Sequence, residues 1–398
     1  MRIGIITYWE SNDNYGQQLQ CWALQQYLRN LGHAPFLIRF KRYKPLPWTP
    51  PPPTIFSRIK KIFKFFLIVP YLKHKKKEKE KKIKIKSEQE YQNWLTSKNQ
   101  LRHFEEFRKE NIISSNQEYA SFEELKNSPP QADVYITGSD QVWNYNLTSP
   151  ELAAYFLQFG DNKVKRIAYA PSIGDTKYPD HLLQTISQYL KRFDAISVRE
   201  NASLNICKKA GYKAIKVCDP TILLHITDYN KLNKKSQIQS SYFYIYSLNY
   251  DSTNDLPWDS IKKYSTTNNK RIIVTPGSGF IPCKELFKNV EYNYATIPQW
   301  LTNIQNSDLF ITASFHGIVF AILYHKRFLF TPLKGKYQNS NCRAAELIEL
   351  CNLNQLIWDG YSTIDKYTSI PINWESVDEA INILRDSSYK FLQNTLTI

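Results

Sequence analysis

The chain has 398 residues, of which 42% are hydrophobic and 14% aromatic, and its formal net charge is +16. This length is enough for two domains, and this apolar content excludes an intrinsically disordered protein. The six cysteines form no CxxC pair and no metal-ligand spacing, and no window holds the roughly 18 apolar residues that a membrane-spanning helix needs. We therefore expect free buried thiols, no bound metal and, since no signal peptide is evident at Met1, a cytoplasmic protein.

The N-terminal part of the chain alternates short strands with helices. Residues Arg2–Thr7 predict a strand, Gly16–Leu31 a helix that ends at Gly32, and Pro35–Phe40 a second strand. A strand, a helix and a strand joined by short links indicate a parallel sheet. The loop Tyr8–Tyr15 then lies on the ligand-binding side of that sheet.

A proline-rich and basic stretch, about residues 45–100, interrupts this pattern. Prolines are too dense between Pro45 and Thr54 for a helix or a central strand. Residues Ser57–Lys86 hold thirteen Lys and Arg and two Glu, so they carry +11 of the total charge of +16. Cations interleave with bulky apolar residues in Arg58–Val69, which is typical of a helix on an anionic membrane surface; an exposed helical hairpin without lipid contact is the alternative. Because the charge is confined to one segment and no base-stacking module accompanies it, we expect no binding of nucleic acid.

The core pattern resumes near Phe104 and divides into two domains. Its first part holds predicted strands at Val134–Ile136, Arg166–Ala170 and Ala195–Val198 and a helix at Asn201–Ala210. A polar, lysine-rich stretch then marks a boundary near residue 227. Beyond it, the predicted strands are Tyr242–Leu248, Arg271–Thr275, Leu309–Thr312 and Phe328–Thr331, and the predicted helices are Pro298–Gln305, Gly317–Tyr324 and Trp374–Asn394. We expect an α/β fold with Rossmann-like domains over residues 1–226 and 227–372, an active site in the cleft between them, and a terminal helix within 373–398 that packs back on the first domain.

Polar residues follow several of the predicted strands. The four motifs are Gly138–Asn144, Ser197–Glu200, Asp219–Thr221 and Ser314–Gly317. In an open α/β sheet, ligands bind at the carboxyl ends of the strands, and the free N–H groups of a helix start attract anions. Together the motifs predict one cleft lined by polar groups.

The charged residues of these motifs suit a small ligand with two negative charges. Arg199 has a planar fork that matches a carboxylate or a phosphate, and His316 at a helix start can donate to an anion or move a proton. A third cation is expected from the loop after the last predicted strand; the candidates are Lys334, Lys336 and Arg343. Structural alternatives stay open, because Arg199 can instead pair with Glu200 or Asp194 and a loop lysine is usually exposed.

The first polar motif also offers an acid and an aromatic ring. Asp140 can accept a hydrogen bond from a hydroxyl or act as a base, unless Ser139 and Asp140 only cap the following turn. Trp143 has a flat face suited to a sugar ring, although a tryptophan is more often a core residue. The chain has no GxGxxG after the first strand, no GxxxxGK[ST] loop, no GxSxG elbow and no HExxH motif. A nicotinamide-dependent or P-loop enzyme is therefore not expected.

In their order along the chain, the motifs resemble those of the polysaccharide pyruvyl transferase family. The matching residues are Asn14–Gly16, Leu19–Gln20 and Ala23–Leu24, together with the four polar motifs. The resemblance implies a fold similar to the two-domain GT-B glycosyltransferases. It implies that phosphoenolpyruvate, as donor substrate and without a cofactor or metal, gives a pyruvyl (carboxyethylidene) group to two hydroxyls of a sugar, forming a pyruvate ketal and releasing phosphate. The implied acceptor is a lipid-linked or cell-surface saccharide, carried on polyprenyl diphosphate, in capsule or exopolysaccharide synthesis.

The same resemblance assigns roles to individual residues. The implied donor-binding residues are Arg199, Ser314, His316, Gly317 and one of Lys334, Lys336 and Arg343. The implied acceptor-binding residues are Asn14, Tyr15, Gly16, Gln17, Ser139, Asp140, Gln141 and Trp143. The implied catalytic residues are His316, Asp140 and Arg199, with His316 contacting the phosphate and supplying the proton.

Two other functions stay open at the level of sequence. A nucleotide-sugar glycosyltransferase would share the fold, but the second domain holds no clear E-x7-E constellation for a nucleotide. A non-catalytic scaffold at the membrane surface would depend on the basic segment and not on Arg199 or His316. For the enzyme, we expect Ser57–Lys86 to dock the protein peripherally on the anionic inner leaflet, where a lipid-linked acceptor would lie.

Overall fold

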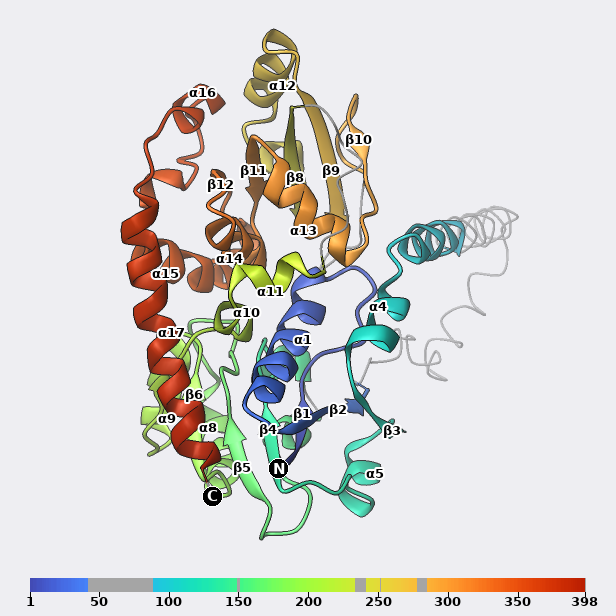
Figure 1. Ribbon diagram of the computed structural model, residues 1–398, viewed down its shortest axis with the longest axis vertical. Helices are drawn as coiled ribbons and strands as arrows, with labels where there is room; N and C mark the ends of the chain where they lie inside the picture. The colour runs from blue at the N-terminus through green and yellow to red at the C-terminus, as the bar shows by residue number, and fades with distance from the viewer. Residues whose placement is uncertain (42–88, 149–150, 233–240, 251, 278–284, 398) are drawn as a thin grey trace, which may run out of the picture. The chain divides into compact units, whose positions relative to one another are not determined.

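The computed structural model describes residues 1–41, 89–148, 151–232, 241–250, 252–277 and 285–397 (Figure 1). The chain divides into two compact units, one of which is Lys44–Leu101 and the other the remainder. Of the smaller unit, residues 89–101 are described, and 89–100 form a helix. The proline-rich stretch and the basic segment Ser57–Lys86 lie outside the described residues. The expected membrane contact therefore stays a prediction.

The N-terminal half of the larger unit is built on a parallel sheet. Within the described ranges this sheet has seven strands, in the order β3-β2-β1-β4-β5-β6-β7. They are β1 (Arg2–Ile6), β2 (Ala34–Phe40), β3 (Ser114–Tyr119), β4 (Val134–Thr137), β5 (Lys165–Ala168), β6 (Ala195–Val198) and β7 (Ile215–Lys216). Ile3 of β1 is opposite both Pro35 of β2 and Val134 of β4, and every pairing is parallel. Because all the strands point the same way, their carboxyl ends lie at one edge of the sheet.

The C-terminal half is built on a second parallel sheet. Its five strands in the described chain have the order β10-β9-β8-β11-β12. They are β8 (Tyr242–Leu248), β9 (Arg271–Gly277), β10 (Glu291–Tyr292), β11 (Leu309–Thr312) and β12 (Phe328–Phe330). The first six residues of β8 and all four of β11 are buried. Such continuous burial is expected of parallel strands that helices cover on both faces.

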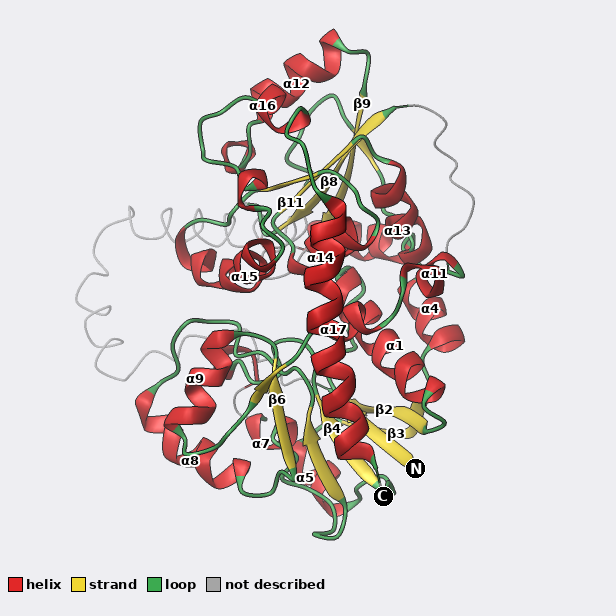
Figure 2. Cartoon of the chain, turned by 60° about the vertical axis from the view of Figure 1, so that its left-hand side comes forward, coloured by secondary structure: helices red, strands yellow, loops and turns green. Residues whose placement is uncertain are grey.

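Helices connect the strands in both halves (Figures 1 and 2). In the N-terminal half they are α1 (Tyr15–Asn30), α4 (Phe104–Asn111), α5 (Phe122–Asn127), α6 (Tyr145–Thr148), α7 (Leu152–Tyr155), α8 (Asp180–Leu190), α9 (Asn201–Lys209), α10 (Pro220–Leu223) and α11 (Ile226–Asn230). In the C-terminal half they are η1 (Thr253–Asp255), α12 (Trp258–Thr267), α13 (Ile297–Asn306), α14 (Phe315–Leu323), η2 (Gly335–Asn341), α15 (Cys342–Leu350), η3 (Asn354–Leu356), α16 (Ile364–Thr368) and α17 (Trp374–Leu396). The α/β class with two Rossmann-like domains is confirmed.

The long terminal helix α17 contacts both halves of the larger unit (Figure 2). Near its start, Asp378 lies 2.8 Å from His325, which follows α14. Three turns later, the hydroxyl of Tyr389 donates to the carbonyl of Leu223 at 2.6 Å, in α10. The helix therefore links the end of the chain to the N-terminal half.

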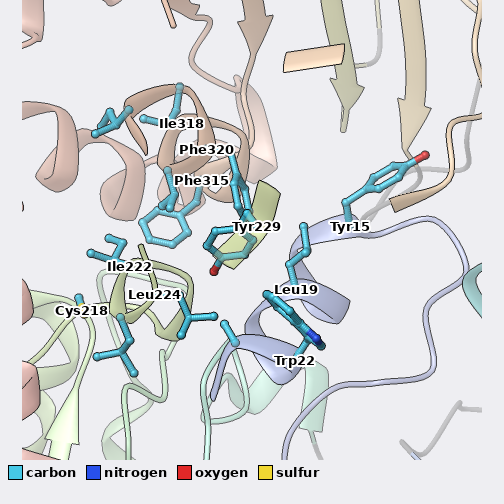
Figure 3. Packing of buried hydrophobic residues seen from close by; sticks show 14 of the residues in the cluster. Tyr15, Leu19, Trp22, Cys218, Ile222, Leu224, Tyr229, Phe315, Ile318 and Phe320 are labelled. Atoms are coloured by element: carbon cyan, nitrogen blue, oxygen red, sulfur yellow. The ribbon is translucent and has the colours of Figure 1, made fainter. Parts of the chain in front are cut away.

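Aromatic rings pack between the two halves. Tyr15 of α1 stacks on Trp300 of α13 with ring centroids 5.0 Å apart, and Trp300 contacts Phe320 of α14 edge to face at 5.5 Å. Tyr229 of α11 contacts Phe320 edge to face with ring centroids 4.9 Å apart. Both residues are labelled in Figure 3. Tyr246 of β8 contacts both Tyr15 and Trp300. We call these five residues the aromatic seam; they place the start of α1 against the C-terminal half.

Some elements differ from the sequence prediction. Strand β3 was not predicted because its sequence, SSNQEY, has only two buried residues and lies at the edge of the sheet. Helices α5, α8 and α12 were also missed. Helix α14 begins at Phe315 and not at Gly317, because the Oγ of Ser314 accepts a hydrogen bond from the amide of Gly317 and caps the helix there.

Candidate active site

Polar side chains from both halves meet at the carboxyl ends of β4, β6, β7 and β11. They come from the turn after β4, the end of β6, the start of α10 and the start of α14. We call the group the polar junction, and its members are Ser139, Asp140, Arg199, Glu200, Asp219 and His316. Each of the six is at most 7% exposed. Residues from all four polar motifs of the sequence thus lie in one buried site.

The hydrogen-bond donors of the polar junction converge on the carboxylate of Asp219. It caps α10, since its Oδ1 accepts from the amide of Thr221 at 3.0 Å and from its hydroxyl at 2.7 Å. The other oxygen, Oδ2, accepts from Ser139 Oγ at 2.8 Å and from Arg199 Nη1 at 2.5 Å. Burial alone would raise the pKa of Asp219, but the neighbouring His316 and Arg199 hold it well below its ordinary value. Asp219 is therefore a buried and ionised carboxylate.

Arg199 follows β6 and turns its guanidinium toward three carboxylates. Besides its bond to Asp219, its Nη2 lies 3.8 Å from Asp140 Oδ1 and its Nε lies 3.8 Å from Glu200 Oε2. Burial alone would lower the pKa of Arg199, but the three acids raise it above its ordinary value. Neither Nε nor Nη2 has a hydrogen-bond partner among the described residues. The guanidinium is thus charged, buried and only partly satisfied.

His316, in the first turn of α14, packs against the first turn of α1. A Cβ at Gly16 would lie 2.1 Å from His316 Nδ1, so only glycine at position 16 leaves room for the imidazole. The other ring nitrogen, Nε2, is buried 3.4 Å from Asp219 Oδ2 and has no hydrogen-bond partner in the described part of the chain. The ring is therefore held between a helix start and a buried carboxylate, and Nε2 contacts that carboxylate without a hydrogen bond among the described residues.

Two helices begin at the junction. The Oδ1 of Asn14 caps α1 by accepting from the amide of Gln17 at 3.3 Å, and Ser314 caps α14 in the same way. A Cβ at Gly317 would approach Thr312 Cγ2 to 2.9 Å, so glycine also lets α14 start close to its own strand. The amino ends of α1 and α14 add partial positive charge where His316 lies.

A second guanidinium comes from Arg343 at the start of α15. It is 9% exposed and lies over the ring of Phe315, 5.9 Å from the centroid, while Arg199 lies 4.7 Å from the same centroid. Burial and then the charge of Arg199 lower the pKa of Arg343. Its Nε has no partner within the described ranges. Arg199, Arg343 and Phe315 line one pocket, whose lining holds three cations and three carboxylates in all.

Two expected acceptor-binding residues prove to be core residues. Trp143 is 2% exposed, its ring stacks on Phe156 at 4.6 Å and its indole N–H bonds the carbonyl of Tyr155. Tyr15 is fully buried in the aromatic seam, and its hydroxyl donates to the carbonyl of Ala295 at 2.6 Å. Both expectations are corrected, since large aromatic side chains bury their area in the core and their rings are not open to a sugar.

The other expected acceptor residues lie closer to the junction. Gln17 is 7% exposed and its Oε1 has no partner among the residues described. Gln141 accepts from Asn144 Nδ2 at 3.1 Å and is 8% exposed. Asp140 has a left-handed backbone (φ 68°), which aims the turn after β4 toward Arg199.

The three candidate loop cations differ in where the structure places them. Lys334 is exposed, over the ring of Trp358 and 3.5 Å from the carbonyl of Asn254. The side chain of Lys336 lies outside the described residues. Among those described, Arg343 is the candidate that shares a pocket with Arg199.

Three residues of the site lie in the predicted motifs but were given no individual functional role. They are Asp219, Glu200 and Phe315. Glu200 accepts from the amide of Ile173 at 3.0 Å and from the hydroxyl of Ser203. The signal for Asp219 is an acid followed by proline after a strand, which marks a helix cap.

In the described part of the chain, no group of His, Cys, Asp or Glu could hold a metal ion, and no helix is long and apolar enough to cross a membrane.

Comparisons with known proteins relate most of the chain to one family and the chain to several structures. A family model for polysaccharide pyruvyl transferase matches residues 14–332, and no curated protein matches the chain. UDP-GlcNAc 2-epimerase from Methanocaldococcus jannaschii, solved with UDP-GlcNAc and UDP, is 11% identical over 99% of both chains with a TM-score of 0.49. MurG from Acinetobacter baumannii is 8% identical over 100% of both chains with a TM-score of 0.41. TM-scores this low carry no argument about activity.

Proposed function

The chain belongs to the polysaccharide pyruvyl transferase family, and we propose that it transfers a pyruvyl group from phosphoenolpyruvate to two hydroxyls of a saccharide. One observation carries this proposal. Four buried donor atoms have no hydrogen-bond partner among the described residues. Three of them, Arg199 Nε and Nη2 and Arg343 Nε, belong to residues that line one pocket, and the fourth, His316 Nε2, lies 3.4 Å from Asp219, which lines the same pocket. Leaving buried donors unpaired costs about 1–3 kcal/mol each, so their retention favours a ligand rich in acceptor oxygens.

Phosphoenolpyruvate matches this donor set in charge and shape. Its carboxylate and phosphate lie on one carbon and need two separate cationic partners. Arg199 and Arg343, both over the ring of Phe315, supply two guanidinium forks of the kind that bind carboxylate and phosphate in pairs of hydrogen bonds. We therefore assign the third cation of the donor site to Arg343 in place of Lys334.

The reaction needs one proton delivered and two removed. A proton adds to the C3 methylene, which leaves positive charge at C2, and the first sugar hydroxyl bonds to C2 and loses its proton. The C2–O bond to phosphate then breaks, the phosphate leaves with that electron pair, and the second hydroxyl bonds to C2 and loses its proton. One hydroxyl proton balances the proton spent on the methylene and the other ends on phosphate.

The polar junction holds groups for each of these transfers. His316 Nε2 is placed to donate to the methylene or to a phosphate oxygen, with ionised Asp219 beside it as a fixed negative charge. Asp140, whose carboxylate lies 3.8 Å from Arg199, is placed to accept a hydroxyl proton. Gln17, with its free Oε1, and Gln141 are the acceptor-side candidates that remain.

The donor is tested by ligand-induced thermal stabilisation. Wild type is compared with Arg199→Ala, His316→Ala and Arg343→Gln in phosphoenolpyruvate and in a panel of nucleotide sugars. A ligand at 100 times its dissociation constant adds about 2.7 kcal/mol, and the three variants should lose most of this shift. Lys390→Ala, which removes an exposed cation on α17, is the matched control and should keep it. A shift with a nucleotide sugar and none with phosphoenolpyruvate would instead support a glycosyltransferase.

The same titration decides between the two loop cations. If Arg343 completes the donor site, Arg343→Gln should weaken phosphoenolpyruvate binding about tenfold or more, while Lys334→Ala should have little effect. The opposite ranking would favour Lys334 over Arg343. Ketal formation itself is checked by phosphate release that depends on a saccharide acceptor and by a new methyl signal in the product.

We also propose, from composition, that Ser57–Lys86 docks the enzyme on an anionic inner leaflet where a polyprenyl-diphosphate-linked acceptor lies. Flotation with anionic vesicles tests this, with a chain lacking Ser57–Lys86 as the comparison. Unchanged flotation after the deletion would contradict the proposal, and loss of flotation together with retained phosphoenolpyruvate binding would support it.

A further inference from the structure

Beside the polar junction, helix α15 of the C-terminal half is fastened to the start of α9 in the N-terminal half. Asn201 is the first residue of α9, and its main-chain amide donates a hydrogen bond to the carboxylate of Glu346 at 3.2 Å. The same carboxylate lies 2.8 Å from Lys216 Nζ, at the end of β7. Lys216 in turn donates to Asn201 Oδ1 at 3.1 Å. We call Glu346, Lys216 and Asn201 the clasp.

The clasp replaces a helix cap that α9 does not provide for itself. The residue at the capping position, Glu200, makes no side-chain hydrogen bond to the helix amides, because its carboxylate is turned to Ile173 and Ser203. Instead, the first amide of α9 donates its hydrogen bond to Glu346, which belongs to the C-terminal half of the larger unit. A carboxylate at that position also suits the positive end of the helix.

The position of the clasp ties it to the two arginines. Asn201 follows Arg199 and Glu200 directly, so the clasp fixes the main chain two residues from one guanidinium. Glu346 is one turn after Arg343 on α15, so it fixes the helix that carries the other. Arg199, Arg343, Lys216 and Glu346 all line the same pocket.

The two guanidinium groups repel each other when no anion separates them. Burial lowers the pKa of Arg343 most and the charge of Arg199 lowers it next, which is the sign of that repulsion, while the nearby Asp140 and Glu200 act in the opposite direction. Movement of α15 away from the N-terminal half would carry Arg343 away from Arg199. The clasp opposes that movement with one ion pair and one amide hydrogen bond, both partly exposed and therefore of modest strength.

We propose that Glu346 is a positioning residue that holds Arg343 opposite Arg199 before the anion arrives. The identity of the anion as phosphoenolpyruvate rests on the proposed function; the clasp itself does not. A site assembled before binding spends less of the ligand's interaction energy on ordering the protein. Loss of the clasp should therefore weaken anion binding more than it slows turnover.

The test compares three changes on α15. Glu346→Ala removes both contacts, Glu346→Gln keeps an acceptor oxygen for the Asn201 amide but loses the charge facing Lys216, and Glu349→Ala removes an exposed acid from the same helix as the control. The KM for phosphoenolpyruvate should rise about tenfold in Glu346→Ala and about threefold in Glu346→Gln, with kcat changed less than about twofold. Glu349→Ala should match wild type.

Two further readouts separate the clasp from the proposed function. Hydrogen exchange in residues 200–204 should speed up in Glu346→Ala and not in Glu349→Ala, because the α9 amide loses its partner. Affinity for inorganic phosphate should fall in parallel with that for phosphoenolpyruvate. Wild type that binds phosphate but not phosphoenolpyruvate would contradict the proposed function and leave the positioning role supported.

The positioning role is overturned by either of two results. In the first, Glu346→Ala exchanges faster at α9 but keeps the wild-type affinity for both anions, so that the clasp is only a structural contact. In the second, kcat falls as far as KM rises in Glu346→Ala, which would place Glu346 in the chemistry. Binding of neither anion by wild type would overturn both proposals together.

Discussion

Two of the contacts between the halves of the larger unit, the aromatic seam and the polar junction, are entered by adjacent residues of α1. Tyr15 enters the aromatic seam, where its ring stacks on Trp300 and its hydroxyl accepts from Arg102 and donates to Ala295. Gly16 enters the polar junction, where its lack of a side chain admits His316. The seam is apolar and largely satisfied, although Trp300 Nε1 has no partner among the described residues; the junction is charged and leaves donors unpaired.

The aromatic seam and the polar junction therefore have different tasks within the same interface: the seam stabilises the fold, and the junction is proposed to bind a ligand. Buried aromatic area is a general source of stability and does not depend on a ligand. Buried charges with unpaired donors cost stability unless a ligand completes them. Changes in the seam should therefore act on the free energy of unfolding, and changes in the junction should act on donor binding and turnover.

The largest effect is expected from Arg199→Ala. Its removal leaves Asp219, Glu200 and Asp140 as buried acids without their cation, which should cost about 3–5 kcal/mol of stability. The loss of a donor-binding group should lower kcat/KM about 1000-fold or more in the protein that remains folded. Steady-state kinetics and urea unfolding measure the two effects.

A buried arginine outside the junction gives the control for that change. Arg166 is 2% exposed, and its guanidinium donates to main-chain carbonyls of Leu157, Phe159 and others. Arg166→Ala should lose stability and keep kcat/KM per folded molecule. Arg199→Lys should recover part of the stability without the activity; full activity in Arg199→Lys would contradict a role for the guanidinium fork.

The next effect concerns pH and Asp219→Asn. The pKa of Asp219 is depressed in the folded protein, so its contribution to stability is complete above the ordinary carboxyl pKa of about 4 and is lost as the pH falls below it. Wild type should exceed Asp219→Asn by about 3 kcal/mol at pH 7, and this difference should begin to shrink as the pH falls below about 4. Urea unfolding from pH 3 to pH 7 checks this. A constant difference across that range would show that the charge of Asp219 is not what stabilises the junction.

Gly16→Ala should damage activity more than stability. The new Cβ would lie 2.1 Å from His316 Nδ1, so the imidazole must move, and we expect kcat/KM to fall about 100-fold. Alanine also favours the helix by up to about 1 kcal/mol, which offsets part of the steric cost. The double variant with His316→Ala tests the cause. If Gly16 acts through His316, the double variant should be no worse than His316→Ala, and additive losses would contradict that route.

The reason for Gly16 shows where prediction from sequence ends. The strand and helix pattern and the four polar motifs were readable because apolar periodicity and strand-end polarity are local signals. The need for glycine at position 16 comes from a histidine 300 residues later, and no local pattern carries that information. Trp143 and Tyr15 were misjudged for the same reason, since a ring suited to a ligand and a ring in the core look alike in sequence.

The role of one site residue, Asp219, could have been predicted from the sequence. An acid followed by proline directly after a strand, as at Asp219, marks a helix cap at a carboxyl end, and a buried cap beside Arg199 was a reasonable partner to propose. The choice of Arg343 among the three loop cations could not be predicted from sequence, because it depends on the packing of Phe315. The clasp of Glu346 was also out of reach, since it joins residues 145 positions apart.

The smallest effect tests the seam itself through Tyr15→Phe. This change keeps the ring stack but removes the hydroxyl that joins Arg102 to the carbonyl of Ala295, so unfolding should become easier by about 1–2 kcal/mol. The control is Tyr389→Phe, which removes a hydroxyl that bonds Leu223 outside the seam and should cost a similar amount. Phosphoenolpyruvate affinity should change less than about threefold in both. If Tyr15→Phe alone weakened donor binding about tenfold, the one peptide bond between Tyr15 and Gly16 would couple the two junctions, and stability and binding would no longer be separate tasks of this interface.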